Sequence, residues 1–162
     1  MSILKKINKN DLIFFLIIIS IFFFDRISKI KVISHQINES RVYVNDYINF
    51  DLVWNTGIGF GLLSSNSNLV YNLITCIIGS VILFLIYLII KSEITEKIIF
   101  SIITGGALGN FYDRLVYFAV PDFIDLHYNS FHWFTFNIAD IFITIGIIIL
   151  IIKDLFLKND QN

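Results

Sequence analysis

The sequence predicts an all-α membrane protein with four transmembrane helices, a small extracytoplasmic β segment and an interfacial loop. The chain has 162 residues, which is enough for a single domain. Hydrophobic residues make up 56% of it, above the roughly 45–50% that is typical of soluble domains. Mean hydropathy is +0.76. An excess of this size must lie in long segments, because scattered over a surface it would leave large exposed apolar patches.

Four apolar segments carry the excess, and we predict spans at about residues 11–33, 69–90, 97–117 and 137–157. The second contains 22 uncharged residues, Leu69 to Ile90, and is long enough to cross a bilayer by itself. The other three are long enough if each tolerates polar residues near one end. The first has a basic start and an apolar core but no small-residue cleavage site, so we interpret it as a retained anchor.

Basic residues indicate the orientation of these spans. Seven lysines fall on one side of a four-span topology, and the other five basic residues fall on the opposite side. The positive-inside rule therefore places both termini in the cytoplasm.

Two segments remain on the outer side. Apolar and polar residues alternate in about residues 41–56, which is the period of a half-buried strand or hairpin. Residues 118–136 are rich in Phe, Tyr, His and Trp, and we predict an interfacial loop of the aromatic-belt kind.

Composition excludes several classes of function. A formal net charge of −1 provides no basic field to attract nucleic acid. The single cysteine, Cys76, excludes an intramolecular disulfide, and its apolar surroundings predict a buried thiol. The three histidines follow no metal-ligand pattern such as HExxH, so we expect no metal site and no cofactor.

Polar residues cluster at the outer ends of the first, third and fourth spans. In "DRISK", Asp25 and Lys29 have the favourable helical i, i+4 spacing. In "WNTGIGFG", residues 54–61, Asn55 offers a donor and an acceptor beside glycines that permit close backbone approach.

The third motif is "GGALGNFYDRL", residues 105–115. Gly105 and Gly109 form a small-xxx-small pair that lets another helix approach. The spacing of the remaining polar positions places four residues on one face: Gly106, Asn110, Asp113 and Arg114.

The fourth motif contains the acids of "VPDFID" and "FNIAD". Asp140 opens the fourth span, with Asn137 one turn earlier, and the helix macrodipole alone could explain an acid there. A second hypothesis is that Asp140 pairs with Asp122 or Asp125 from the preceding loop. Two carboxylates held close cannot both ionise, so one takes a proton from water while the other binds the carbonyl under attack, as in pepsin-like aspartic proteases.

In this order and spacing, "DRISK", "NTGIGFG", "GGALGNFYDRL", "VPDF" and "FNIAD" resemble signal peptidase II, the lipoprotein signal peptidase family of bacteria. The resemblance covers nearly the whole chain. It implies a membrane aspartyl endopeptidase that cleaves signal peptides from prolipoproteins, immediately before a diacylglyceryl-modified cysteine. It also implies a multi-pass protein of the bacterial inner membrane, with the active site near the outer leaflet. Its partners would be these prolipoproteins and membrane lipids, and we expect a monomer.

By this resemblance Asp122 and Asp140 are the catalytic pair, and Asp125 is a bystander. Five residues would bind substrate or position the pair: Asn55, Gly57, Asn110, Arg114 and Asn137. Asp25 and Lys29 would provide structural support, and Asp113 would hold Arg114 or the loop. The 41–56 segment is similar to the family's β-cradle, and the following aromatic segment to its mobile, helix-bearing loop. Pro121, Gly59 and Ile141 depart from the family pattern without removing a reactive group.

Two other classes compete with a protease. Intramembrane Asp, Asn and Arg also mark ion pathways, but here the polar groups all lie near one membrane face. The second competing class is a non-catalytic membrane scaffold, which would tolerate loss of either acid.

Overall fold

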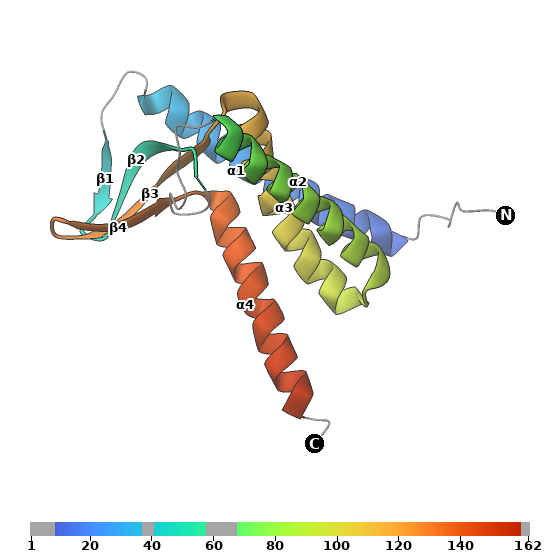
Figure 1. Ribbon diagram of the computed structural model, residues 1–162. Coiled ribbons are helices and arrows are strands. Elements are labelled where there is room, and N and C mark those ends of the chain that lie inside the picture. The colour runs from blue at the N-terminus through green and yellow to red at the C-terminus, as the bar shows by residue number, and fades with distance from the viewer. Residues whose placement is uncertain (1–8, 37–40, 58–67, 160–162) are drawn as a thin grey trace.

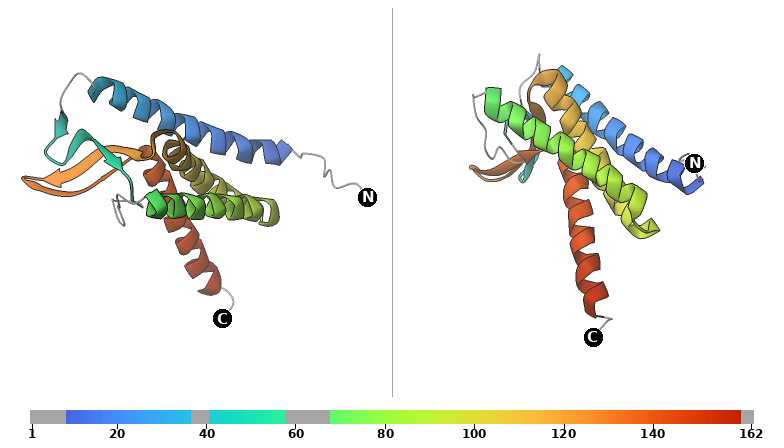
Figure 2. Two further views of the ribbon diagram at one scale, coloured as in Figure 1. Left: turned by 45° about the horizontal axis from the view of Figure 1, so that its top comes forward. Right: turned by 45° about the vertical axis from the view of Figure 1, so that its right-hand side comes forward.

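The computed structural model describes residues 9–36, 41–57 and 68–159. In these residues the elements follow the order α1 (Lys9–Gln36), β1 (Val42–Asn45), β2 (Ile48–Asn55), α2 (Asn68–Lys91), α3 (Ile94–Tyr117), β3 (Val120–Tyr128), β4 (Phe131–Phe136) and α4 (Ile138–Asn159). The sheet projects from one end of the helices, away from the start of α1 and the end of α4 (Figure 1). Toward its C-terminus α4 diverges from α1 and α2 (Figure 2).

Helices form at all four positions where the sequence predicts them. By length and apolar composition, the segment Leu69–Lys91 of α2 qualifies as a membrane span among the described residues. Large apolar side chains nevertheless point outward from each helix; Phe15 is 57% exposed, Leu83 70%, Leu115 56% and Phe156 69%. Cys76 lies on this outward surface, so the prediction of a buried thiol is wrong. Its neighbour Ile77 is 62% exposed, whereas Ile74 is buried, so the apolar run around Cys76 has an outward and an inward side.

The β segment predicted at about 41–56 forms a hairpin of β1 and β2. It belongs to a four-stranded sheet in the order β1-β2-β3-β4, with all neighbours antiparallel.

The prediction of an interfacial loop at residues 118–136 is wrong, because this segment forms β3 and β4 and contains no helix. Its β-branched and aromatic residues favour a pleated, half-buried surface, and we attributed the same residues to a membrane belt. A two-residue turn joins the strands, with Asn129 in the left-handed conformation at φ 54°. Pro121 is buried in β3 opposite Trp54.

Glycines let α3 pack closely between α1 and α4. A Cβ atom added to Gly105 would lie 2.9 Å from Cβ of Ile21 on α1. One added to Gly106 would lie 2.6 Å from the backbone oxygen of Ala139 on α4. Gly109, the other member of the predicted pair, also approaches α1, since an added Cβ atom would lie 2.5 Å from Oδ2 of Asp25. The predicted small-residue contact of Gly105 and Gly109 is therefore confirmed, and α3 fixes the distance between the two helices that carry the polar motifs.

We expect Gly106→Ala to destabilise the protein by about 1–3 kcal/mol, the usual cost of overpacking. The added methyl group meets backbone, which can yield only if α3 and α4 separate. Thermal unfolding in detergent micelles measures the effect. The matched control is Gly79→Ala in α2, where the added carbon would lie 3.3 Å from the ring edge of Phe111, a side chain that can move. Equal destabilisation by both changes would contradict this account.

Candidate active site

The N-terminus of α4 is closed by a reciprocal cap between Asn137 and Asp140. Oδ1 of Asn137 accepts from the backbone N–H of Asp140 at 3.1 Å, and Oδ2 of Asp140 accepts from the N–H of Asn137 at 3.2 Å. This arrangement is a capping box. Capping thus explains an acid at the start of α4, but it uses only one carboxylate oxygen. The other, Oδ1, accepts from Nδ2 of Asn110 at 2.8 Å.

Asp122 reaches the same place from β3. It is 3% exposed, and each of its oxygens accepts one amide hydrogen bond. Nδ2 of Asn137 donates to Oδ1 at 2.6 Å, and Nδ2 of Asn55 donates to Oδ2 at 2.9 Å. Asn137 therefore bonds both acids, which ties β3 to the start of α4. Burial, and then the negative charge of Asp140, raise the pKa of Asp122 to about 7.

Both carboxyl groups line one cavity of about 420 Å³ between α2, α3, α4 and the sheet. Its polar lining is Asn55, Asn110, Arg114, Asp122, Asp140 and Thr144; its apolar lining is Ile78, Val81, Leu85, Ile103, Ala107, Val120, Ile143 and Ile147. The polar groups come from the end of the helices nearest the sheet, and the apolar ones extend along the helices. The cavity can therefore hold a polar backbone at one end and a hydrocarbon chain along the rest.

Lys29 connects α1 to this site. It is fully buried, and its ammonium donates to Oδ2 of Asp25 at 2.8 Å, to Oδ2 of Asp113 at 2.7 Å and to Oδ1 of Asn110 at 2.8 Å. Because the oxygen of Asn110 faces Lys29, its amide N–H must face Asp140.

Asp25 completes the connection between α1 and α4. Its Oδ1 accepts from the backbone N–H of Ala139 at 2.9 Å, in the first turn of α4. The i, i+4 pair predicted between Asp25 and Lys29 is present. Together these two residues hold the helix that carries Asp140.

The prediction that Asp113 holds Arg114 or the loop is wrong. Asp113 accepts from Arg26 and Lys29 and makes no described bond to Arg114. Successive residues of a helix point in different directions, so Asp113 faces α1 while Arg114 faces the cavity. Arg26 has no predicted role from its position in the sequence, and its guanidinium also lies 4.8 Å from the ring centre of Tyr112.

Arg114 joins the loop after β2 to the cavity. One of its nitrogens donates to the backbone oxygen of Gly57, whose own N–H donates to Oδ1 of Asn55 at 2.8 Å. Nε and Nη1 of Arg114 are buried without a partner among the described residues. Tyr71, on α2, donates from its hydroxyl to the backbone oxygen of Arg114 at 2.7 Å; a tyrosine in an apolar run gave no signal in the sequence. Residues 58–61 of the glycine-rich motif, including Gly59, lie outside the described residues.

Asp125 does not line this cavity. It lies three residues after Asp122 in β3, so the two side chains point to opposite faces of the sheet. Burial would raise the pKa of Asp125, but hydrogen bonding to His132 and the nearby positive charges hold it below its usual value. Of the two candidates left open by the sequence, the geometry brings Asp122 together with Asp140.

The outward apolar side chains place the chain among membrane proteins, and the two carboxyl groups in one cavity are groups that a hydrolase can use. The family profile described as Signal peptidase (SPase) II matches residues 17–156. The chain is 47% identical to the lipoprotein signal peptidase of Pelagibacter ubique (strain HTCC1062), over 98% of this chain and 97% of that one. It is 46% identical to the lipoprotein signal peptidase of Francisella tularensis subsp. novicida (strain U112), over 72% of this chain and 75% of that one. The chain therefore belongs to the signal peptidase II family of membrane proteases.

Solved structures agree with this assignment. A bacterial membrane enzyme determined by the in meso method at 2.3 Å resolution is similar with a TM-score of 0.76 and 31% identity, over 92% of this chain and 91% of that one. A second, at 1.9 Å resolution, is similar with a TM-score of 0.70 and 32% identity, over 88% and 92% of the two chains.

Proposed function

We propose that this protein removes signal peptides from bacterial prolipoproteins, cleaving on the N-terminal side of the diacylglyceryl-modified cysteine with a water activated by Asp122 and Asp140. The observation that carries the proposal is the shared cavity, which has two carboxyl groups at one end and apolar side chains along the rest. A peptide bond next to a lipid-modified residue requires both environments within one site. The family membership supports the same substrate class.

The environments of the two acids suggest how they divide the chemistry. Asp122, whose pKa is raised to about 7, holds the proton and donates it to the carbonyl oxygen of the scissile bond. Asp140 is the acceptor: its carboxylate takes a proton from the attacking water, whose oxygen bonds to the carbonyl carbon. As the tetrahedral intermediate collapses, Asp140 returns its proton to the leaving nitrogen, the C–N bond breaks, and Asp122 recovers its own proton. Arg114, which lines the cavity, would donate to a carbonyl of the substrate backbone.

We further propose that all four helices span the inner membrane, with both termini in the cytoplasm and the sheet outside, and that the protein acts as a monomer without a cofactor. The outward apolar side chains of α1, α3 and α4 support this topology, as does the position of the sheet away from the start of α1 and the end of α4. The pair Asp122 and Asp140, which we call the dyad, then lies near the outer leaflet. There a diacylglyceryl chain can enter sideways from the bilayer into the cavity between α2 and α4.

An ion pathway is not supported by the hydroxyl groups farther along the helices. Thr75, Ser101 and Thr104 each donate to the backbone oxygen four residues earlier in their own helix. They therefore form no described chain of groups leading from the dyad toward the other membrane face.

The proposed substrate can be tested with purified protein in lipid-containing micelles. We expect cleavage of a prolipoprotein that carries diacylglycerol on its cysteine, and none of the same precursor without the lipid. Mass spectrometry of the product locates the cut. Equal cleavage of both precursors, or a cut elsewhere, would contradict the substrate assignment while leaving the dyad to be tested separately by substitution.

The pH dependence of cleavage tests the role of Asp122. The folded protein holds a proton on Asp122 below about pH 7 and loses it above, because burial and Asp140 raise the pKa. If that proton is needed, kcat/KM falls as pH rises through 7, by up to about tenfold per pH unit. The hydrogen bond from Asn55 lowers this pKa, so Asn55→Ala should shift the fall to higher pH. A rate that stays constant from pH 6 to 9 would exclude Asp122 as the proton donor.

A further inference from the structure

A second group of ionisable side chains lies on the sheet, outside the dyad cavity. Asp125 and His127 are two apart in β3 and so share one face. His132 in β4 is the direct cross-strand partner of His127, and Asn49 in β2 is the partner of Asp125. We call these four residues the strand-face cluster. Asp125, His127 and Asn49 are buried, and the side chain of His132 is 42% exposed.

The ligand atoms of the strand-face cluster are close enough to share one ion. Nδ1 of His132 lies 2.9 Å and 2.8 Å from the two oxygens of Asp125, and Nδ1 of His127 lies 3.8 Å from Oδ2. One ligand atom from each of the three residues lies within 4.8 Å of the others. Tetrahedral zinc with bonds of about 2.0–2.1 Å places its ligands about 3.3 Å apart. The observed distances bracket that value, and the half-exposed His132 has room to adjust.

We propose that Asp125, His127 and His132 bind a divalent transition-metal ion of the zinc class. Two imidazoles and a carboxylate are the ligands that such ions prefer. The site is separate from the dyad, and the hydrolysis proposed above does not use it. The ion would join β3 to β4 through side chains on both strands.

Asn49 provides an independent observation at the same place. Asn49 is 4% exposed, and its Oδ1 is buried without a hydrogen-bond partner among the described residues. Its Nδ2 lies 3.2 Å from Nδ1 of His127 and 3.5 Å from Oδ2 of Asp125. Rotation of the amide exchanges oxygen for nitrogen with little change in shape. That rotation turns the unpartnered oxygen toward the ion as a fourth ligand.

Arg41 competes with the ion for Asp125. Its Nη2 donates to Oδ2 of Asp125 at 2.8 Å and lies 3.3 Å from Nδ1 of His132. Its Nε is 3.2 Å from Oδ2 of Asp51, and the side chain is 40% exposed, so the guanidinium can leave Asp125 while keeping a partner. Metal binding therefore requires that Arg41 leaves Asp125. The affinity of the site for the ion depends on the free-energy cost of breaking this ion pair.

The sequence showed no metal pattern because the ligands come from two strands. His127 and His132 are five residues apart, and the two-residue turn between β3 and β4 brings them opposite each other. HExxH is a spacing for a helix and does not apply to a hairpin.

The test is titration of ZnCl2 into the purified full-length protein in micelles, without a polyhistidine tag and in a Cys76→Ala background, followed by calorimetry. CoCl2 provides a visible absorption spectrum that reports the coordination geometry. We expect one saturable Zn²⁺ site in the micromolar range or tighter. His127→Ala, His132→Ala and Asp125→Asn should each weaken it by more than roughly 100-fold, above the usual effect of losing a group that only orients a ligand.

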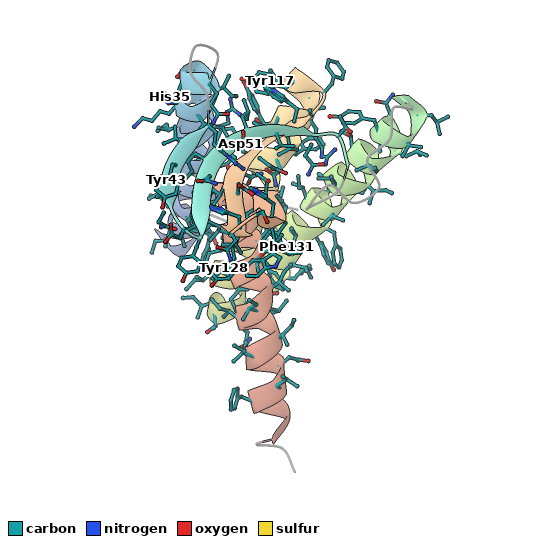
Figure 3. All side chains as sticks on the ribbon, turned by 90° about the vertical axis from the view of Figure 1, so that its left-hand side faces the viewer. His35, Tyr43, Asp51, Tyr117, Tyr128 and Phe131 are labelled. Carbon is teal, nitrogen blue, oxygen red and sulfur yellow. The ribbon has the colours of Figure 1, made fainter. Side chains whose placement is uncertain are left out.

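His35→Ala is the matched control, since His35 is the remaining histidine and lies at the end of α1, far from Tyr128 and Phe131 beside the hairpin turn (Figure 3). The His35→Ala variant should bind Zn²⁺ with the affinity of the parent protein. Arg41→Ala should bind Zn²⁺ more tightly, a gain that misfolding cannot produce. The proposal is overturned if no saturable site is found, if the site survives His127→Ala with His132→Ala, or if Arg41→Ala weakens binding.

Discussion

Replacing either acid of the dyad by its amide, Asp122→Asn or Asp140→Asn, is expected to lower cleavage of a diacylglyceryl prolipoprotein by more than about 1,000-fold. Each replacement removes one of two groups that must exchange protons in the same step. The effects of replacing such groups on the rate are strongly non-additive. The double variant should therefore be hardly slower than either single one. The loss should appear in kcat, because asparagine keeps nearly the same shape and most of the contacts that position a substrate.

The matched control for the dyad is Asp46→Asn, an exposed acid in the turn between β1 and β2. It should cleave at the rate of the parent protein. Binding of the lipidated precursor by the inactive variants separates a chemical defect from unfolding. Cleavage that persists in either dyad variant would reject the mechanism and would favour a scaffold role for this cavity.

The second large effect is expected for Lys29→Met, which should destabilise the protein by about 3–5 kcal/mol and abolish cleavage. The ammonium is fully buried against two carboxylates, Asp25 and Asp113, and removing it leaves both without their shared cation. Breaking a buried ion pair from one side has a cost of this size. The loss also frees Asn110, whose oxygen no longer has a donor that turns its amide toward Asp140.

Lys31→Met provides the comparison, because Lys31 lies on the same helix and its side chain is exposed. Thermal unfolding in micelles should show a large decrease for Lys29→Met and little change for Lys31→Met. Replacement of Asn110 by Asp tests the orientation separately, since it places a third carboxylate beside Lys29 and removes the donor to Asp140. We expect that variant to lose activity with a smaller loss of stability. Similar unfolding temperatures for Lys29→Met and the parent protein would show that the buried network does not support the fold.

The outer part of the fold was predicted only in part. Residues 41–56 were recognised because alternation there is regular, and they form β1 and β2. In residues 118–136 the alternation is interrupted, for example at Phe123 and Ile124, and the density of aromatic side chains predicts an interfacial loop instead. Recognising β3 would also have separated Asp122 from Asp125, because residues three apart in a strand point to opposite faces.

The sequence by itself determined the four helices, the position of the polar motifs near one end of them and the identity of the candidate acids. Long apolar runs form helices, and an ionisable residue within one is costly unless it meets a partner, so its position in the sequence is informative. Only the tertiary structure decided which groups meet. Lys29 bonds Asn110 and Asp113 on α3, and Asp25 bonds the start of α4. It also decided that Asp140, a helix cap by its spacing, faces Asp122 across one cavity. Those contacts join residues up to 114 positions apart, and local spacing contains no information about which of several buried donors and acceptors will pair across such a distance.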